Sequence, residues 1–532
     1  MARHNEVKYN KWGVHGAVLI VCLVALPLLI LFFWQHDVKI TVEKGLNYGS
    51  NETSTPSNNN YLHGLIPSNF DKESCLSRYE WPLFRKSFPY MPSSYLLHKL
   101  RNYEDLHKKC GPNTPLYQKS IQQLNSGHSS IEPMECNYVV WIPHNGLGNR
   151  ILTLASTFLY AILTNRVMLI QMNDELVDLF CEPFPDTSWI LPPDFPIKNL
   201  NEFDVNSNVT YGNMLDKHVI ISNHSINTEV ESLPSYVYVH LVYDYHALDR
   251  LFFCNDDQIV LRKVNWLLLK SDQYFIPSFY SSTPMFEEKL DRLFPAKESV
   301  FYLLAHYLIH PSNNVWGLVR RYYMSYLAKA DEKIGIQVRV FFFTKVSSDV
   351  IFQQIQNCSK VESVLPELDF NGTKAFKPDE QNPSKAILVA SLYSYYYEKL
   401  KSMYYEHSVK TGELVSVYQP SHEEQQKTKN QSHNKKALAE MYLLSLCDML
   451  MTSGWSTFGY ASSGLAGIKP VILMTIRNKN IPDMPCVREA SMEPCYIFPA
   501  KPSCKGKTVD KEKLQQYVKQ CPDFDHGIKL FD

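Results

Sequence analysis

Apolar residues along this chain form short unbroken runs that alternate with stretches of helical spacing. The run Tyr138–Ile142 leads into a glycine-containing loop at 144–150, and apolar positions then recur at helical spacing over 151–163. A second unbroken run covers Val167–Ile170. Runs of this length are typical of strands buried on both faces of a parallel sheet. The pattern therefore predicts a strand, a loop, a helix and a strand in succession.

A similar unit lies near the end of the chain. The pattern predicts a helix over 437–447, a strand over 448–452, a loop over 453–460, a helix over 461–467 and a strand over 471–474. Further buried strands are predicted over 334–343 and 386–391. Because strands alternate with helices, we expect an α/β fold with mainly parallel sheets. It divides into an N-terminal half, residues 71–325, and a C-terminal half, residues 326–532, which ends in a cysteine-rich segment.

The first 70 residues have a different pattern. Segment 16–34 is apolar without a charged side chain, and Arg3, Lys8 and Lys11 precede it. It predicts a transmembrane signal anchor over 13–34, a cytosolic tail over 1–12 and, by the positive-inside rule, a lumenal remainder. The polar residues that follow predict a flexible stem over 35–70. This is the layout of a single-pass type II protein of the Golgi membrane.

Sequons for N-glycosylation agree with a lumenal location. They lie at Asn51, Asn208, Asn223, Asn357, Asn371 and Asn430.

Composition and charge narrow the function classes. The 532 residues are 45% hydrophobic and 13% aromatic, which excludes disorder throughout the chain. With 53 Lys+Arg against 54 Asp+Glu, the net charge of −1 supplies no long-range field for nucleic acid. We therefore expect no nucleic-acid partner.

The twelve cysteines include no C-x-x-C pair, which argues against a zinc ribbon or a thioredoxin-like site. Cys447 falls inside a predicted helix, so we expect a buried free thiol there. Without Cys22 of the anchor, ten cysteines remain for pairing. Four of these lie between Cys486 and Cys521, where we expect cross-links in one of three connectivities.

The loop at 144–150 reads His-Asn-Gly-Leu-Gly-Asn-Arg. Glycines between a strand and a helix let backbone N–H groups approach a ligand, and the helix N-terminus suits an anion. A dinucleotide fold would need a third glycine, where Asn149 and Arg150 stand instead. Function is thus predicted for Asn145, Gly146, Gly148, Asn149 and Arg150.

Two later segments have matching chemistry. In the strand that ends at Arg339, Gly335 and Gln337 share the face of Arg339, and an Arg at a strand's end sits where α/β sheets bind ligands. In 452–460, a strand ends in hydroxyls and glycines before a small-residue helix, a geometry suited to phosphate. By contrast, 421–436 contains no apolar residue and predicts a solvated surface insertion.

Three motifs, taken in order, carry a family resemblance. They are HNGLGNR at 144–150, IGIQVR at 334–339 and TSGWSTFGY at 452–460, the last lying between LAEMYLLSLCDMLM and GLAGIKP. With YAILTNRVMLI, YLIHPSNNVWG and YLAKADEKIGIQVRVF, the text from about residue 137 onward closely resembles the plant α-1,2-fucosyltransferases that build xyloglucan side chains.

The resemblance implies a GT-B-type glycosyltransferase, with two Rossmann-like domains facing across a cleft. It implies inverting transfer of L-fucose from GDP-fucose to the 2-hydroxyl of terminal β-galactose on xyloglucan, without a metal or other cofactor. By the same resemblance Arg339 clamps the diphosphate, loop 456–460 cradles phosphate and nucleoside, and loop 144–150 shapes the fucose and acceptor side. The donor-binding residues are then Gly335, Gln337, Arg339, Ser453, Ser456, Thr457, Phe458 and Tyr460.

Guanine offers two N–H donors that one carboxylate can accept together. Glu440 and Asp448 are candidates for this contact, and either is also open to a capping or surface role. Metal-dependent transferases need a D-x-D after a buried strand. The one present, at Asp523 to Asp525, follows Cys521-Pro522 near the C-terminus and is interpreted as a coincidence.

A catalytic base is harder to place. Asp272 stands among apolar and aromatic residues that would raise its pKa, and His144 is the second candidate. Asp244 and His310 are alternative bases. Asp272 could instead be a structural residue of a turn. A loose transition state with a water relay would need no strong base.

Three functions stay open at this stage. The first is the xyloglucan reaction, the second is the same chemistry on arabinogalactan or another cell-wall glycan, and the third is a catalytically silent sugar-binding scaffold in a Golgi complex. A homodimer, or a complex with other Golgi glycosyltransferases, is equally open.

Overall fold

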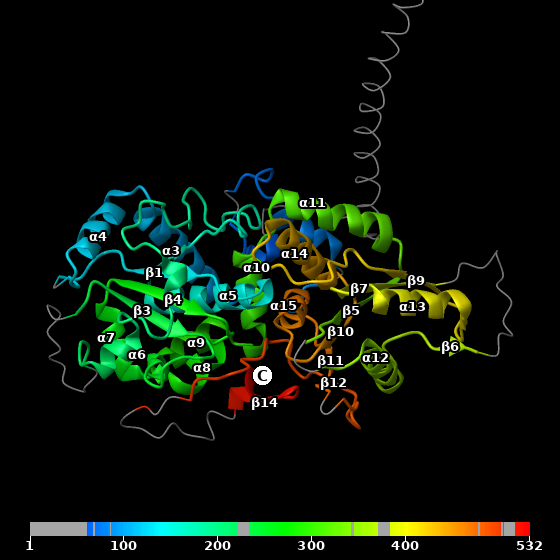
Figure 1. Cartoon of the computed structure of the whole chain (residues 1–532). Helices are drawn as coiled ribbons and strands as arrows, with labels where there is room; N and C mark the ends of the chain where they lie inside the picture. The colour runs from blue at the N-terminus through cyan, green and yellow to red at the C-terminus, as the bar shows by residue number, and fades with distance from the viewer. Residues whose placement is uncertain are drawn as a thin grey trace, which may run out of the picture. The chain divides into compact units, whose positions relative to one another are not determined.

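Two mainly parallel sheets organise the chain, and the first is built from the early apolar runs (Figure 1). The computed structural model describes residues 61–67, 70–85, 87–130, 132–221, 233–341, 345–370, 383–476, 479–501, 504 and 516–532. Residues Asn60–Asp532 form one compact unit. The predicted α/β class is confirmed.

The first sheet has the order β2-β1-β4-β3, and all its neighbours are parallel. Its strands are β1 (Tyr138–Ile142), β2 (Val167–Ile170), β3 (Tyr236–Leu241) and β4 (Trp266–Ser271). The predicted bounds of β1 and β2 are confirmed. Helix α5 (Leu147–Thr164) begins four residues before its predicted start, because the extended backbone of Gly146 is already its N-cap.

Helix α5 is also the one helix among the described residues that is long and apolar enough to cross a membrane. Its apolar window is 89% buried inside the protein, so it is a core helix. The other helices of this half are α2 (Leu76–Glu80), α3 (Ser94–Cys110), α4 (Pro115–Asn125), α6 (Tyr211–Asp216), α7 (Asn255–Lys263), α8 (Ile276–Ser282), α9 (Glu287–Leu293), α10 (Val300–Leu308) and α11 (Asn313–Tyr322).

The second sheet has the order β12-β11-β10-β5-β7-β9. Its strands are β5 (Glu332–Val338), β7 (Ser384–Ser391), β9 (Leu414–Tyr418), β10 (Met449–Ser453), β11 (Val471–Leu473) and β12 (Cys486–Arg488). Only β12 at the edge runs antiparallel to its neighbour. The late strands predicted from the sequence are therefore confirmed in position, but β5 ends at Val338, well before the predicted end at residue 343.

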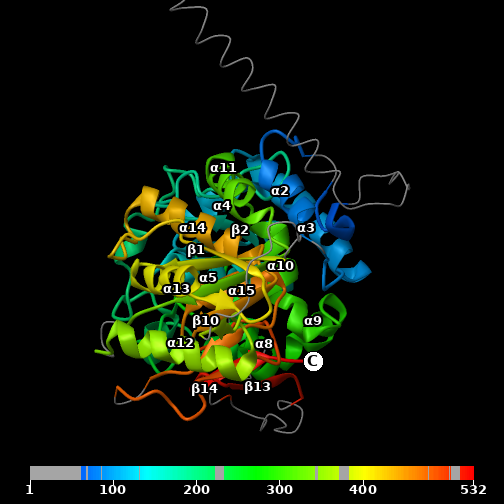
Figure 2. The ribbon, with the colours of Figure 1, turned by 90° about the vertical axis from the view of Figure 1, so that its right-hand side faces the viewer.

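Helices cover both faces of this sheet (Figure 2). Helices α12 (Ser348–Glu362) and α13 (Tyr395–Glu406) pack on the face of Ile334 and Ile336. Helices α14 (Gln431–Ser445) and α15 (Thr457–Ala466) belong to the core on the other face. Helix α15 also packs against α5, so the helices that follow the two predicted loops lie side by side.

Two helix starts correct the sequence-based prediction. The polar segment 421–436 is not a loop throughout, because α14 begins at Gln431, where the Asn430 side chain accepts from the His433 N–H. Likewise α15 starts within the predicted loop 453–460, since the Ser456 hydroxyl caps it by accepting from Gly459. Hydrophobic periodicity did not reveal the start of α14, because its first turn, Gln431 to Asn434, is polar, and the start of α15 depends on a hydroxyl cap rather than on an apolar pattern.

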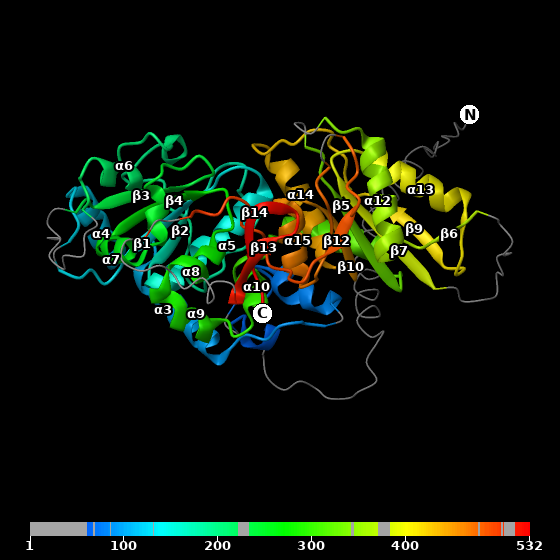
Figure 3. The ribbon, with the colours of Figure 1, turned by 90° about the horizontal axis from the view of Figure 1, so that it is seen from below.

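Two small antiparallel pairs complete the fold. They are β6 (Leu368–Asp369) with β8 (Ser408–Val409), and the C-terminal hairpin of β13 (Val518–Cys521) and β14 (Phe524–Leu530). The hairpin lies beside α15, as Figure 3 shows.

Five disulfides tie the described region together, and Cys447 is a buried free thiol, as predicted. The pairs are Cys75–Cys181, Cys110–Cys136, Cys254–Cys504, Cys358–Cys486 and Cys495–Cys521. The expectation that the four C-terminal cysteines pair among themselves is wrong for Cys486 and Cys504. Both reach partners far back in the chain because the C-terminal segment packs across the earlier elements.

The predicted tail, anchor and nearly all of the stem lie outside the described residues, as do Asn51, Asn223 and Asn371. Asn208 and Asn430 are exposed, and Asn357 is half-buried on α12. The domain boundary at residue 325 falls within the compact unit and stays a prediction.

Candidate active site

A cavity of about 360 Å³ lies where strands of both sheets end. Asp272 directly follows β4, Arg339 directly follows β5, and Ser391 is the last residue of β7; all three line the cavity. Ligands of open α/β sheets bind beyond the carboxyl ends of the strands. This cavity is therefore the candidate site.

The two predicted glycine loops meet at the cavity. A Cβ on Gly148 would lie 2.6 Å from the backbone nitrogen of Phe458 and 2.7 Å from the carbonyl carbon of Thr457, so only glycine fits there. Asn149 accepts from the Thr457 hydroxyl at 3.1 Å and donates to the Asp272 backbone carbonyl at 2.8 Å. One asparagine thus joins the N-terminus of α5, the N-terminus of α15 and the end of β4.

Asp272 is held in place by several donors. Asn145, in the left-handed region at φ 58°, donates its amide to Oδ2 at 3.0 Å. The Tyr243 N–H and the Gln273 amide donate to Oδ1 at 3.2 and 2.9 Å. Burial raises the pKa of the Asp272 carboxyl to about 6, against the bonds from Gln273 and Tyr243, which lower it. The carboxylate is thus oriented, and its raised pKa makes it a stronger base than an exposed aspartate.

Arg339 faces the same cavity from the second sheet. Its N–H donates to the Ser453 hydroxyl at 2.9 Å, and its Nη2 donates to Oε1 of Gln426 at 2.6 Å. A Cβ on Gly146 would lie 2.8 Å from the Gln426 amide nitrogen, so this glycine makes room for that side chain. Burial lowers the pKa of the Arg339 guanidinium from its usual value. Because arginine stays protonated in proteins, the side chain still presents a cation to the cavity.

Glu440 lines the cavity from α14, as a guanine-binding role would need. Its Oε1 accepts from the Ser421 hydroxyl, and burial raises the pKa of the Glu440 carboxyl to about 8. Asp448 lies elsewhere: it precedes β10, accepts from the Lys333 N–H at 2.9 Å and is therefore at the opposite end of the sheet from the cavity.

Several other predicted residues pack or form hydrogen bonds with neighbouring residues of the protein. The face of Gly335 is packed, since a Cβ there would lie 2.6 Å from Leu450, and Gln337 both lines the cavity and accepts from the Ser453 N–H at 3.3 Å. Arg150 donates to Glu175 at 3.1 Å, and Tyr460 donates to the buried Asp523. Thr457 and Phe458 line the cavity itself.

The alternative bases are not among the cavity's lining residues. Burial, with the nearby Lys270, lowers the pKa of His144 to about 4, so its imidazole is a weak base. Asp244 accepts from His240 at 2.9 Å, and His310 is buried in the core. Of the proposed bases, the structure thus places Asp272 at the cavity.

Sequence reasoning missed other lining residues. Gln426, His433 and Asn434 come from the polar segment taken as a surface insertion, while Tyr243 and Phe498 come from loops without a motif. An Asn helix cap at Asn430 was the one signal available for the first group.

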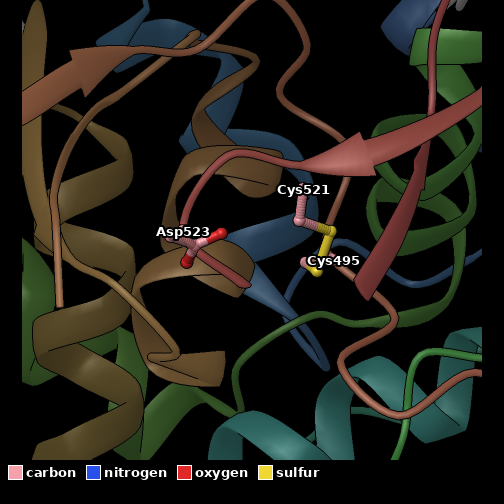
Figure 4. A group of neighbouring side chains, drawn as sticks. All are labelled: Cys495, Cys521 and Asp523. Atoms are coloured by element: carbon pink, nitrogen blue, oxygen red, sulfur yellow. A yellow bond between two sulfur atoms is a disulfide. The ribbon is translucent and has the colours of Figure 1, made fainter. Parts of the chain in front are cut away.

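The cluster of Asp523 with Cys495 and Cys521 is not a thiolate metal site. Asp523 lies near Cys495 and Cys521, but Figure 4 shows these sulfurs joined in a disulfide, so no thiolate is available as a ligand. Asp523 instead accepts from the Trp455 N–H at 2.9 Å.

The arrangement suits group transfer from a phosphorylated donor. A cation and two helix N-termini can stabilise charge that develops on a leaving phosphate, and a carboxylate with a raised pKa can accept a proton from a hydroxyl. The N-cap of α5, Gly146, makes no side-chain cap bond, which leaves N–H groups of the first turn for a ligand.

Comparisons with known proteins point the same way. Residues 36–505 match the family described as xyloglucan fucosyltransferase. The galactoside 2-α-L-fucosyltransferase of Pisum sativum is 49% identical over 478 residues, 89% of this chain and 82% of that protein. The protein of that name from Arabidopsis thaliana is 47% identical over 523 residues, 96% of this chain and 91% of its own.

A solved structure is also similar. It is the structure of a mutant of FUT1 from Arabidopsis thaliana in complex with GDP, 48% identical to this chain, with a TM-score of 0.80. The match covers 89% of this chain and 100% of the solved one.

Proposed function

This chain belongs to the xyloglucan fucosyltransferase family, and from that premise we propose that it is a Golgi galactoside 2-α-L-fucosyltransferase. It moves L-fucose from GDP-fucose to the 2-hydroxyl of terminal β-galactose on xyloglucan side chains, in a GT-B-type arrangement. The observation that carries the proposal is that Arg339 and Asp272, from different sheets, line one cavity. The cation suits the donor's diphosphate and the carboxylate suits the acceptor's hydroxyl.

The donor occupies the side of the second sheet. Arg339 binds the diphosphate, and the N–H groups at the start of α15, behind its Ser456 cap, contribute the partial positive charge of a helix N-terminus. Glu440, buried on α14, accepts the two N–H groups of guanine. These contacts supply the charge stabilisation that a metal supplies in other transferases, so the reaction proceeds without one.

The chemical step is a single inverting displacement. The galactose 2-oxygen attacks the anomeric carbon of fucose on the face opposite the diphosphate, and the bond from that carbon to the β-phosphate oxygen breaks. The hydroxyl proton passes to Asp272, and the pair of electrons of the broken bond leaves with GDP. Asn145, Gln273 and the Tyr243 N–H hold the carboxylate in position while the proton arrives.

The experiment is an acceptor screen with the full chain in detergent. GDP-fucose and a galactosylated xyloglucan oligosaccharide, with EDTA present, should yield GDP and an α-1,2-linked fucose, identified by linkage analysis. Product on arabinogalactan but not on xyloglucan would assign the other acceptor. GDP binding without GDP release on any acceptor would refute an enzyme and favour the scaffold.

Topology needs a separate test. The proposed cytosolic tail, anchor over 13–34 and lumenal catalytic region predict that the region from residue 60 onward resists protease in sealed Golgi vesicles. Digestion of that region without detergent would contradict a type II orientation.

A further inference from the structure

A row of aromatic side chains borders the cavity on one side. This aromatic rim consists of Tyr243, Phe498, Phe524, Trp455 and Phe341. Successive ring centroids lie 6.5, 5.2, 5.1 and 6.3 Å apart, so the rings form a continuous chain. All except Phe524 also line the cavity itself.

The rim is open to solvent where a large ligand could reach it. Residue Tyr243 is 64% exposed and residue Phe498 is 46% exposed. An exposed Tyr or Phe leaves a large apolar area in contact with water. Adjacent exposed rings mark interaction sites more often than single exposed rings do. Both rings belong to the end of the rim that adjoins Asp272.

Hydrogen bonds connect the rim to the proposed reacting groups. The Tyr243 N–H donates to Asp272 at 3.2 Å. The Phe498 N–H donates to Gln273 Oε1 at 3.3 Å, and the Gln273 amide donates to Asp272 at 2.9 Å. At the other end, the Arg339 guanidinium lies 5.6 Å from the centre of the Phe341 ring. The rim thus runs from the proton acceptor to the diphosphate cation.

The C-terminal hairpin holds the middle of the rim in place. Trp455 has a left-handed backbone at φ 59°, which a bulky side chain rarely adopts. Asp523 supports it twice: Oδ2 accepts the Trp455 N–H at 2.9 Å, and the backbone carbonyl accepts the indole N–H at 2.6 Å. The next residue, Phe524, packs edge-on against Trp455, and the Cys495–Cys521 disulfide fixes the turn (Figure 4). Asp523 of the D-x-D sequence therefore supports the aromatic rim.

We propose that the aromatic rim is the acceptor subsite, on which sugar rings of a long neutral glycan stack beyond the galactose that reacts. Sugar rings present C–H faces that pack on aromatic rings, and a neutral glycan requires no charged partner. The residue proposed to bind guanine, Glu440, lines the same cavity but is not part of the rim. This inference rests on the proposed function, because the galactose must lie beside Asp272 while the rest of the chain extends outward.

The test compares variants that keep or remove each exposed ring. Tyr243→Leu and Phe498→Leu should each raise KM for a galactosylated xyloglucan oligosaccharide about five- to tenfold, since a stacked ring contributes on the order of 1 kcal/mol. Tyr243→Phe and Phe498→Tyr should restore it. KM for GDP-fucose, and KM for the short acceptor lactose, should not change. Tyr405→Leu, at a residue of α13 that is 90% exposed, is the matched control.

An unchanged oligosaccharide KM in both leucine variants would overturn the proposal. A rise in the KM for GDP-fucose instead would assign the rim to the donor and overturn it as well. If the parent protein transfers fucose to no galactoside, the proposed function fails. Calorimetric binding of the same oligosaccharide to the parent and to Phe498→Leu then still decides whether the rim binds glycan.

Asp523 acts through Trp455 and is a positioning residue. Asp523→Asn replaces one acceptor oxygen with an amide, so the oligosaccharide KM should rise while the KM for GDP-fucose holds, and the change in indole fluorescence on adding oligosaccharide should diminish. Loss of kcat without a change in either KM would contradict this role.

Discussion

Glu440 offers the sharpest test of how the donor is recognised. The structure gives a carboxyl that is buried on α14, lines the cavity and has its pKa raised to about 8 by desolvation. Guanine has two N–H donors that need the ionised form. Below pH 8 the protein must therefore lose a proton before it makes this contact.

The magnitude follows from the fraction of ionised carboxyl. With a pKa of about 8, roughly one molecule in a hundred is ionised at pH 6 and roughly half at pH 8, and the apparent Kd is the intrinsic Kd divided by that fraction. Affinity for GDP should thus rise by about 50-fold from pH 6 to pH 8 through this group. The sign is fixed, because the acid is neutral on the low-pH side and the ligand binds its anion.

Isothermal titration calorimetry with GDP and adenosine diphosphate measures the effect. Adenosine diphosphate has the same phosphates but neither the N1–H nor the 2-amino group of guanine, so the ratio of the two Kd values cancels the titration of phosphate and of nearby groups. That ratio should grow with pH in the parent protein and stay flat in Glu440→Gln. A ratio independent of pH in the parent, or the same pH dependence in the variant, would refute the guanine contact.

Three further predictions concern catalysis, packing and stability. Asp272→Asn should lower kcat by roughly 10²–10⁴-fold and remove the acid limb of the pH–rate profile near the raised pKa of about 6. The control Asp244→Asn, at an exposed residue, should keep both the kcat and the acid limb. An acid limb that persists in Asp272→Asn would exclude Asp272 as the base. Gly148→Ala should abolish transfer because its Cβ would lie 2.6 Å from backbone, whereas Gly317→Ala, which meets only a flexible arginine, should not, and equal kcat/KM in both would be inconsistent with the close approach. Replacing the Cys358–Cys486 pair by serines should cost about 2–5 kcal/mol and lower Tm in a thermal melt; an unchanged Tm would contradict a stabilising role.

Local patterns predicted six strands of the two main sheets, β1, β2, β5, β7, β10 and β11, but not β3, β4, β9 or β12. The unbroken apolar runs of β1 and β2 are buried along their whole length, as expected for strands inside a parallel sheet. Their bounds follow from the positions of the polar and turn residues around them. The sequence also revealed four candidate site residues from their types and positions: Gly146, Gly148, Asn149 and Arg339. These residues do converge on one cavity.

Contacts between distant segments were decided only by tertiary structure. Gln426 and His433 looked like surface residues because their partners, Arg339 and the cavity, lie far away in sequence. Asp448 looked equivalent to Glu440 in the sequence. It precedes β10, however, and therefore lies at the opposite end of the sheet from the cavity, which is at the carboxyl ends of the strands. Spacing along a chain does not reveal which end of a strand faces a cleft.

The sequence by itself therefore determined the fold class and the family, because both depend on local periodicity and on short motifs. Tertiary structure decided which cysteines pair, which of the two acids lines the cavity and that Asp523 of the C-terminal D-x-D supports an aromatic rim. The physical reason is the same in each case: these properties belong to the meeting of α5, α15 and the C-terminal hairpin, and long-range packing, rather than any local preference, brings those segments together.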